Sequence, residues 1–260
     1  MGRVLSLSLF LGWLILGAGG ESRADAPAQA DYASLYAELL LEYTRSVNAE
    51  VGTRVDYPGL GGEPRWDALI GQLAEVDPSR LSSREEELAF WINAYNILAI
   101  DLVVRHYPVE SIRDIGSIFR SVWKREAGRI GGRGYSLDEI EDEILRPMRD
   151  PRIHGAIVCA SISCPNLART PYRADRLDAQ LRESIRAWLA RPEKGFAVDR
   201  AARGARLSRV FKWFADDFGG RRGVLDFVQA HLPEAERAWL EENRPALGIS
   251  YFDYDWGLND

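Results

Sequence analysis

This 260-residue sequence has few cysteines, few histidines and no net positive charge. It contains two cysteines and three histidines. Two cysteines cannot build a disulfide-dense scaffold or a four-cysteine zinc site. The 39 acidic residues outnumber the 33 basic ones, so the net charge is −6, which argues against nonspecific nucleic-acid binding. Hydrophobic residues at 46% and charged residues at 28% are ordinary values, so the sequence predicts a globular protein.

Nucleotide-binding motifs are also missing. The sequence has no Walker loop, no dinucleotide-binding fingerprint and no G-x-S-x-G turn of the serine hydrolases. We therefore expect no cofactor.

The first 30 residues have the pattern of a secretory signal peptide. Arg3 precedes an apolar run over residues 4–17, and small and then polar residues follow. This run is shorter than the roughly 20 residues that span a bilayer, and an uncleaved anchor is the alternative. Cleavage after Gly20 or Ala30 predicts a periplasmic or secreted protein with no integral membrane span.

The remaining sequence predicts a helix-rich α+β domain around a small, mainly antiparallel sheet with a buried central helix. We expect residues 31–80 to form a helical extension that packs on a domain of residues 81–260. The apolar spacing predicts helices over 31–47, 66–73, 83–105, 136–148, 175–189 and 224–240. Turn residues predict hairpins over 124–135 and 196–210, and the apolar run 153–160 predicts a buried strand. The aromatic tail 249–260 is expected to dock on the domain.

The predicted central helix, residues 83–105, is apolar on most of its sides. Ser82 and Glu85 have the spacing of a capping box at its start. The helix also carries Asn93 and Asn96 into the core. An unpartnered buried amide costs about 1–3 kcal/mol, so these side chains should hold loop backbone or a catalytic group.

Among the three histidines, only one lacks a local explanation. His106 and His231 each end a predicted helix just before a proline, where a histidine complements the helix dipole. His154 instead lies in an apolar run, and Cys159 and Cys164 follow within eleven residues. A buried structural histidine and a functional one are both open at this point.

The two cysteines allow three interpretations. The first is thiol catalysis, in which Pro165 opens a helix and leaves Cys164 at its positive end, with His154 as the base. On an extended strand His154 and Cys159 lie roughly 16 Å apart on opposite faces, so their pairing needs a bend in the chain. The second is a structural disulfide between Cys159 and Cys164, which an oxidising compartment favours. The third is a metal site of His154 and both cysteines, although the spacing matches no standard zinc signature.

Four motifs together resemble a known family. They are FWINAYN at residues 90–96, YSLDEIE at 135–141, the segment from RIH to SCP at 152–165, and YDWGLN at 254–259. Their order resembles the family catalogued as domain of unknown function 547 over residues 81–259. The resemblance implies an exported bacterial protein of one such domain and no particular activity. The family pattern places in its motifs Asn93, Asn96, Glu141, His154, Cys159, Cys164 and Pro165. Gly155 departs from the pattern, because an aromatic residue is expected after the histidine.

These residues favour thiol-dependent hydrolysis or acyl transfer if the chain is an enzyme. Cys164 or Cys159 would be the nucleophile and His154 the base, with Glu141, Asn93 or Asn96 orienting it. The substrate would be a peptide or amide of the cell envelope. The alternative is a non-catalytic envelope module that binds a peptide or glycan, with the two cysteines joined. Neither hypothesis involves a metal or a nucleic acid.

Overall fold

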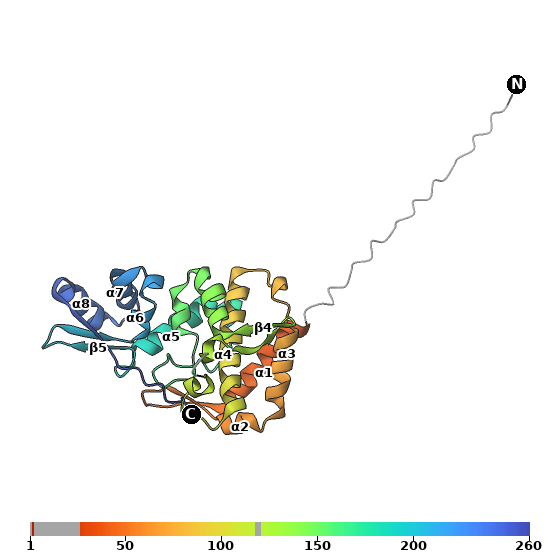
Figure 1. The fold of residues 1–260 in the computed structure, drawn as a ribbon. Helices are drawn as coiled ribbons and strands as arrows, with labels where there is room; N and C mark the ends of the chain where they lie inside the picture. Colours follow the sequence, from red (N-terminus) through yellow and green to blue (C-terminus); the bar gives the residue numbers. More distant parts are fainter. Residues whose placement is uncertain (1, 3–26, 118–120) are drawn as a thin grey trace.

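The structure, a computed structural model, describes residues 2, 27–117 and 121–260 (Figure 1). Its helices are α1 (Pro27–Tyr43), α2 (Tyr57–Gly61), α3 (Pro64–Glu75), α4 (Arg84–His106), α5 (Leu177–Leu189), α6 (Val210–Trp213), α7 (Gly220–His231) and α8 (Glu234–Asn243). The helices predicted over 31–47, 66–73, 83–105, 175–189 and 224–240 are confirmed as α1, α3, α4, α5 and the pair α7–α8. Pro233 separates the last two, because proline cannot continue a helix.

The strands that the structure describes are short and form three small sheets. They are β1 (Thr44–Ser46), β2 (Thr53–Val55), β3 (Glu126–Ile130), β4 (Arg133–Ser136), β5 (Phe196–Asp199), β6 (Gly204–Leu207) and β7 (Gly248–Tyr251). Strands β1 and β2, β3 and β4, and β5 and β6 pair antiparallel, and β7 joins β6 in parallel. Both predicted hairpins, the α+β class and the mainly antiparallel pairing are confirmed.

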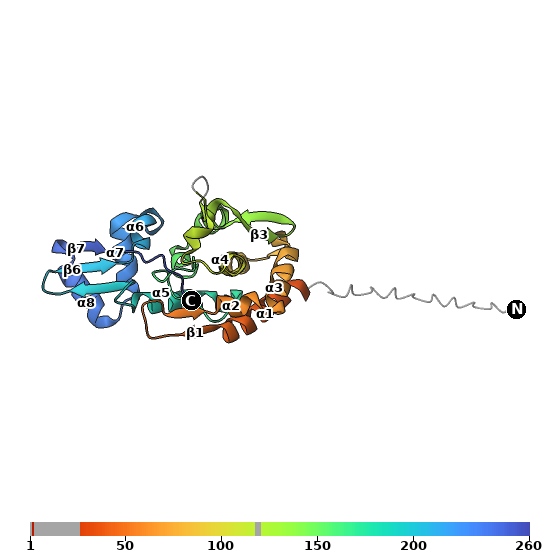
Figure 2. The same cartoon turned by 60° about the horizontal axis from the view of Figure 1, so that its bottom comes forward.

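Helix α4 is the buried centre of the larger part of the fold. Every residue from 88 to 103 is buried, and Figure 2 shows α4 with β3, α3 and α1 around it. The N-cap is Ser83, one residue later than predicted, since its hydroxyl accepts the Glu86 backbone N–H at 3.1 Å. Ser82 instead donates its N–H and hydroxyl to the Glu86 carboxylate. By length and composition α4 is the one described helix that could span a membrane, and its apolar window is mostly buried inside the fold.

Two hydrophobic cores divide the molecule. The larger surrounds α4, and the smaller joins α5 to α7, α8 and the β5–β6–β7 sheet (Figure 1). Helix α5 belongs to both, because Leu177 and Leu181 lie in the first core and Ile185 and Trp188 in the second. The two cores therefore share one rigid helix.

The prediction of a buried strand over residues 153–160 is wrong. A 3₁₀ helix covers Pro151–Gly155, with Asp150 as N-cap and the proline at the first helical position, and irregular chain follows. Gly155 lies against α5, where an added Cβ would come within 2.3 Å of the Ile185 Cδ1 atom. An apolar run of this length is equally compatible with a buried strand and a buried helical turn, so periodicity alone could not decide.

The helix predicted from Ser136 exists but has unusual geometry. The Ser136 hydroxyl accepts the Glu139 N–H at 3.1 Å, as a cap should. The segment Glu139–Leu145 is a π-helix, and Arg146–Met148 continues it as a 3₁₀ turn. Such irregular turns are frequent at functional sites.

Both ends of the described chain pack on the fold. Residues of α1, α2 and α3 belong to the core around α4, with the Tyr32 and Phe90 rings 5.7 Å apart. The tail docks as predicted: Asn259 is buried and accepts a hydrogen bond from the Tyr57 hydroxyl at 2.5 Å. The predicted signal peptide, residues 1–30, lies almost entirely outside the described residues and stays a prediction.

Candidate functional site

A pocket of about 240 Å³ lies where the two cores meet. The larger core contributes α4, the π-helix and the segment from His154 to Pro165. The smaller core contributes α6 and the residue after it, and the C-terminal tail closes one side. The lining residues are Tyr95, Trp123, Asp138, Glu141, Asp142, His154, Ile157, Cys159, Cys164, Pro165, Val210, Trp213, Phe214, Tyr254 and Trp256.

A tight turn brings the two cysteines together in this pocket. Ala160 has a positive φ of 60°, and the Cys164 N–H donates to the Ser161 carbonyl at 3.1 Å. Both cysteines are free, with their sulfur atoms 2.6 Å apart. The Cys159 N–H also donates to the Cys164 sulfur at 3.2 Å. The turn that a Cys159–Cys164 pair requires is therefore present.

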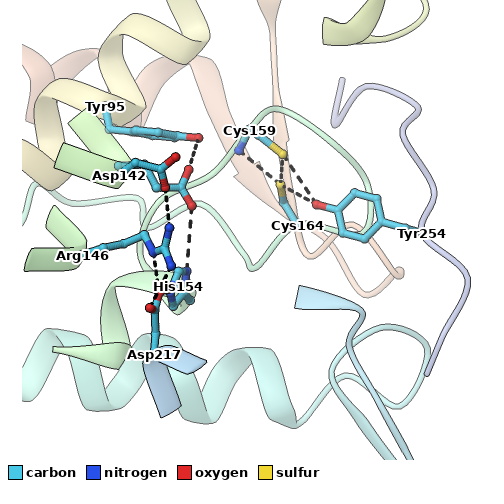
Figure 3. Close-up of polar contacts among 9 residues, drawn as sticks. Tyr95, Asp142, Arg146, His154, Cys159, Cys164, Asp217 and Tyr254 are labelled. Carbon is cyan, nitrogen blue, oxygen red and sulfur yellow. Dashed lines mark hydrogen bonds and ion pairs between the residues drawn. The ribbon is translucent and has the colours of Figure 1, made fainter. Parts of the chain in front are cut away.

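Tyr254 completes the surroundings of the sulfur atoms (Figure 3). Its hydroxyl lies 3.1 Å from the Cys164 sulfur and 3.5 Å from that of Cys159. Burial opposes ionisation of Cys164, but hydrogen bonds from Cys159, Tyr254 and backbone N–H groups outweigh it and lower its pKa. The same contact with Cys164, together with burial, raises the pKa of Cys159. Cys164 is therefore the more acidic thiol of the pair.

A buried lysine donates hydrogen bonds to the backbone of this turn. Lys194 is 1% exposed, and its ammonium donates to the carbonyls of Val51, Ile162 and Cys164 at 2.9, 3.1 and 2.5 Å. Burial lowers its pKa to about 8, and the charge of Cys164 opposes that shift. Lys194 therefore fixes the backbone of the nucleophile candidate and leaves a positive charge beside it at neutral pH.

His154 is held on the other side of the pocket by a carboxylate and an aromatic ring. Its Nε2 lies 2.7 Å from Asp217 Oδ2, and its ring stacks on Phe214 at 4.3 Å. Arg146 donates two hydrogen bonds of 2.7 and 2.9 Å to the same carboxylate. Burial lowers the pKa of His154, and the bond to Asp217 opposes this only in part. The imidazole is neutral near pH 7, so with Nε2–H on Asp217 its Nδ1 is the basic nitrogen.

Glu141 faces that basic nitrogen. Its Oε1 lies 4.0 Å from His154 Nδ1, and its Oε2 accepts the Tyr95 hydroxyl at 3.2 Å. Burial raises the pKa of Glu141 to about 8, although the Tyr95 bond works the other way. Glu141 is therefore a carboxylic acid at neutral pH and can donate a proton.

Asn93 and Asn96 hold loop backbone, which confirms the first of the two roles predicted for them. Asn93 exchanges two hydrogen bonds of 2.8 Å with the backbone of Tyr172. Asn96 donates to the Ala156 carbonyl at 2.9 Å and accepts the Val158 N–H at 2.8 Å. Asn96 thus fixes the segment between His154 and Cys159.

Replacing Asn96 by alanine is expected to lower the free energy of unfolding by about 2–3 kcal/mol. The substitution leaves a buried N–H and a buried carbonyl without partners. Denaturant unfolding measures the loss. Asn243→Ala is the matched control, since Asn243 makes one hydrogen bond within α8, and it should change stability by less than about 0.5 kcal/mol. Equal losses in both variants would contradict this role for Asn96.

The candidate residues from the sequence line one pocket but do not form one hydrogen-bonded group. Glu141, His154, Cys159 and Cys164 all face the cavity. Within the described residues, no hydrogen bond joins His154 to either sulfur, and the partner of His154 is Asp217. The prediction of a helix after Pro165 is wrong, because residues 165–168 are irregular. Hydrogen bonds from side chains and backbone, and not a helix dipole, therefore lower the pKa of Cys164. No cluster of three or more potential metal ligands occurs in the described ranges, so the metal interpretation gains no support.

Residues 78–189 match a family model described as "Protein of unknown function, DUF547". These residues are therefore a DUF547-like segment of this chain. The match contains α4, the π-helix and the segment from His154 to Cys164. It ends with α5, whereas the sequence resemblance was expected to reach residue 259. Searches of curated proteins and of solved structures found no match.

Several side chains in and around this pocket were missed by reasoning from sequence. Asp217, Lys194 and Tyr254 all lie beyond the matched segment, at separations of 63, 30 and 90 residues from their partners. Arg146 lies inside the matched segment, but it follows the last residue of the π-helix, where a basic residue is common because it complements the helix dipole. Only Tyr254 had a signal, because it belongs to the aromatic tail that was expected to dock.

Proposed function

We propose that this protein is an exported thiol-dependent hydrolase or acyl transferase that acts on a peptide or amide in the cell envelope. The observation that carries the proposal is the Cys164 sulfur, which receives hydrogen bonds from Cys159 and Tyr254 inside a pocket. A thiolate stabilised in this way is a nucleophile at neutral pH.

The proposed acylation step uses Cys164 and Glu141. The thiolate attacks the acyl carbon, a carbon–sulfur bond forms, and the carbon–nitrogen bond of the amide breaks. Glu141 gives its proton to the departing amine, which makes the amine a better leaving group. The products of this step are a thioester on Cys164, a free amine and an ionised Glu141.

The proposed deacylation step uses His154. Its Nδ1 takes a proton from water or from an acceptor amine, which then attacks the thioester and releases the Cys164 thiolate. Asp217 and the Phe214 ring hold the imidazole in the required orientation. The proton returns from His154 to Glu141 across their 4.0 Å separation, so the acid is restored.

A second candidate is a non-catalytic envelope module with a Cys159–Cys164 disulfide. The observation that favours it is the 2.6 Å separation of the two sulfur atoms, which needs only a small shift to reach a bonded length of about 2.05 Å. The bond would remove the thiolate, and the aromatic pocket would then serve for binding alone.

One experiment separates the two candidates. The mature protein, produced in an oxidising compartment, is alkylated without reduction, and a second sample is treated with 4-nitrophenyl acetate. Intact mass should show two alkylatable thiols in the first sample, and peptide mapping should place one acetyl group on Cys164 in the second. Labelling only after reduction would support the binding module. Free thiols without an acetyl adduct would overturn the catalytic proposal.

A further inference from the structure

Aromatic rings form one wall of the pocket beside the cysteines. The ring centroid of Tyr254 lies 4.8 Å from Trp213 and 4.5 Å from Trp256, and Trp123 lies 5.5 Å from Trp256. Trp213 nevertheless remains 47% exposed. The faces of such rings carry partial negative charge and attract cations.

Three acidic residues line the pocket. Asp138, Glu141 and Asp142 contribute carboxyl groups, and neither lysine nor arginine lines the cavity. Asp142 pairs with Arg146, and Glu141 accepts from Tyr95. Asp138 makes no side-chain hydrogen bond or ion pair with the described part of the chain. It is therefore the carboxylate left available to a ligand.

The basic side chains near the pocket already contact other residues of the chain, and they do not line the cavity. Arg146 is bound by Asp142 and Asp217. Arg113 lies over the Trp256 ring at 5.1 Å. Lys124 is near enough to favour the charged form of Asp138, but burial and Asp142 outweigh it and raise the pKa of Asp138. A ligand cation would relieve the unfavourable burial of this carboxylate.

We propose that the pocket selects a substrate with an amine or guanidinium cation, held between Asp138 and the aromatic wall of Trp213, Tyr254 and Trp256. Because this wall includes the tyrosine that contacts both sulfurs, the cation lies beside the position of the reacting acyl group. The volume of about 240 Å³ suits one side chain of amino-acid size. The identity of the acyl part rests on the proposed function, whereas the binding of the cation does not.

Calorimetric titration of the full-length mature protein tests this inference. The probes are Nα-acetyl-lysine amide, its neutral isostere Nα-acetyl-norleucine amide, and Nα-acetyl-glutamate amide. The lysine derivative should bind at least about 10-fold more tightly than the other two. Equal affinities, or a preference for the glutamate derivative, would overturn the inference.

Two variants and a control locate the effect. Asp138→Asn should remove most of the preference for the lysine derivative, and Trp213→Leu, which keeps the site apolar, should weaken its binding by about 3–10-fold. Asp67→Asn removes one negative charge from the exposed start of α3 and should leave the preference intact. A preference that Asp138→Asn leaves unchanged would contradict the assignment.

Because binding is measured without turnover, the inference and the proposed function can fail separately. A cation preference without an acetyl adduct on Cys164 would reject catalysis and keep the binding site. An adduct without a cation preference would do the reverse.

Discussion

Replacing Cys164 by serine is expected to abolish the thioester adduct and to reduce turnover by at least about 100-fold. A serine hydroxyl stays protonated at neutral pH, and the donors around residue 164 cannot change that. The fold should persist, since the substitution keeps the shape of the turn. Intact mass after reaction with an activated ester measures the adduct, and circular dichroism checks the fold.

Cys159→Ser is the matched control for this substitution. Serine can still donate a hydrogen bond to the Cys164 sulfur, while the backbone N–H of residue 159 and the Tyr254 hydroxyl stay in place. This variant should therefore still form an adduct on Cys164, and it cannot form the disulfide. Adduct formation on Cys159 in the Cys164→Ser variant, at the rate of the unmodified protein, would reverse the assignment of the nucleophile.

Replacing Glu141 by glutamine is expected to stabilise the protein at high pH by up to about 5 kcal/mol. Burial raises the pKa of Glu141 from its ordinary value of 4.5 to about 8, and a pKa difference of one corresponds to about 1.36 kcal/mol. Between these two values the folded protein binds one more proton than the unfolded chain. The free energy of unfolding is therefore highest below about pH 4.5, and it decreases as the pH rises to 8. Glutamine carries no charge, so the variant lacks this loss.

Denaturant unfolding at pH 5, 7 and 9 measures the difference between the two proteins. The advantage of Glu141→Gln should grow with pH and level off above about 8. Glu143→Gln, an exposed position on the same π-helix, controls for the loss of one carboxylate. An advantage that is largest at pH 5 would show that Glu141 is ionised in the folded protein. Turnover of the unmodified protein should fall above about pH 8, where Glu141 loses the proton that it donates.

The central helix and the two asparagines show what local pattern could predict. The uncharged run from Ala89 to Ile100 predicts burial on all sides, and a buried amide must find partners, which Asn93 and Asn96 do. The glycine pair at 131–132 predicts the β3–β4 hairpin for an equally local reason. The clustering of His154, Cys159 and Cys164 within eleven residues indicates the pocket, because chain separation so short limits how far apart they can lie.

The hydrogen-bonded partners of these side chains depend on contacts that no local pattern encodes. Asp217 on His154, Tyr254 on the sulfurs and Lys194 under the turn each come from a segment 30 or more residues away. The segment 153–160 is helical and irregular because Pro151 and Asp150 start a turn and Gly155 packs against α5. By itself the sequence determined the α+β class, the buried helix and the group of candidate residues that line the pocket, since periodicity, capping and composition act over a few residues. Only the tertiary structure decided which carboxylate orients His154 and which groups stabilise the thiolate, because desolvation and hydrogen bonding depend on what packs around each atom.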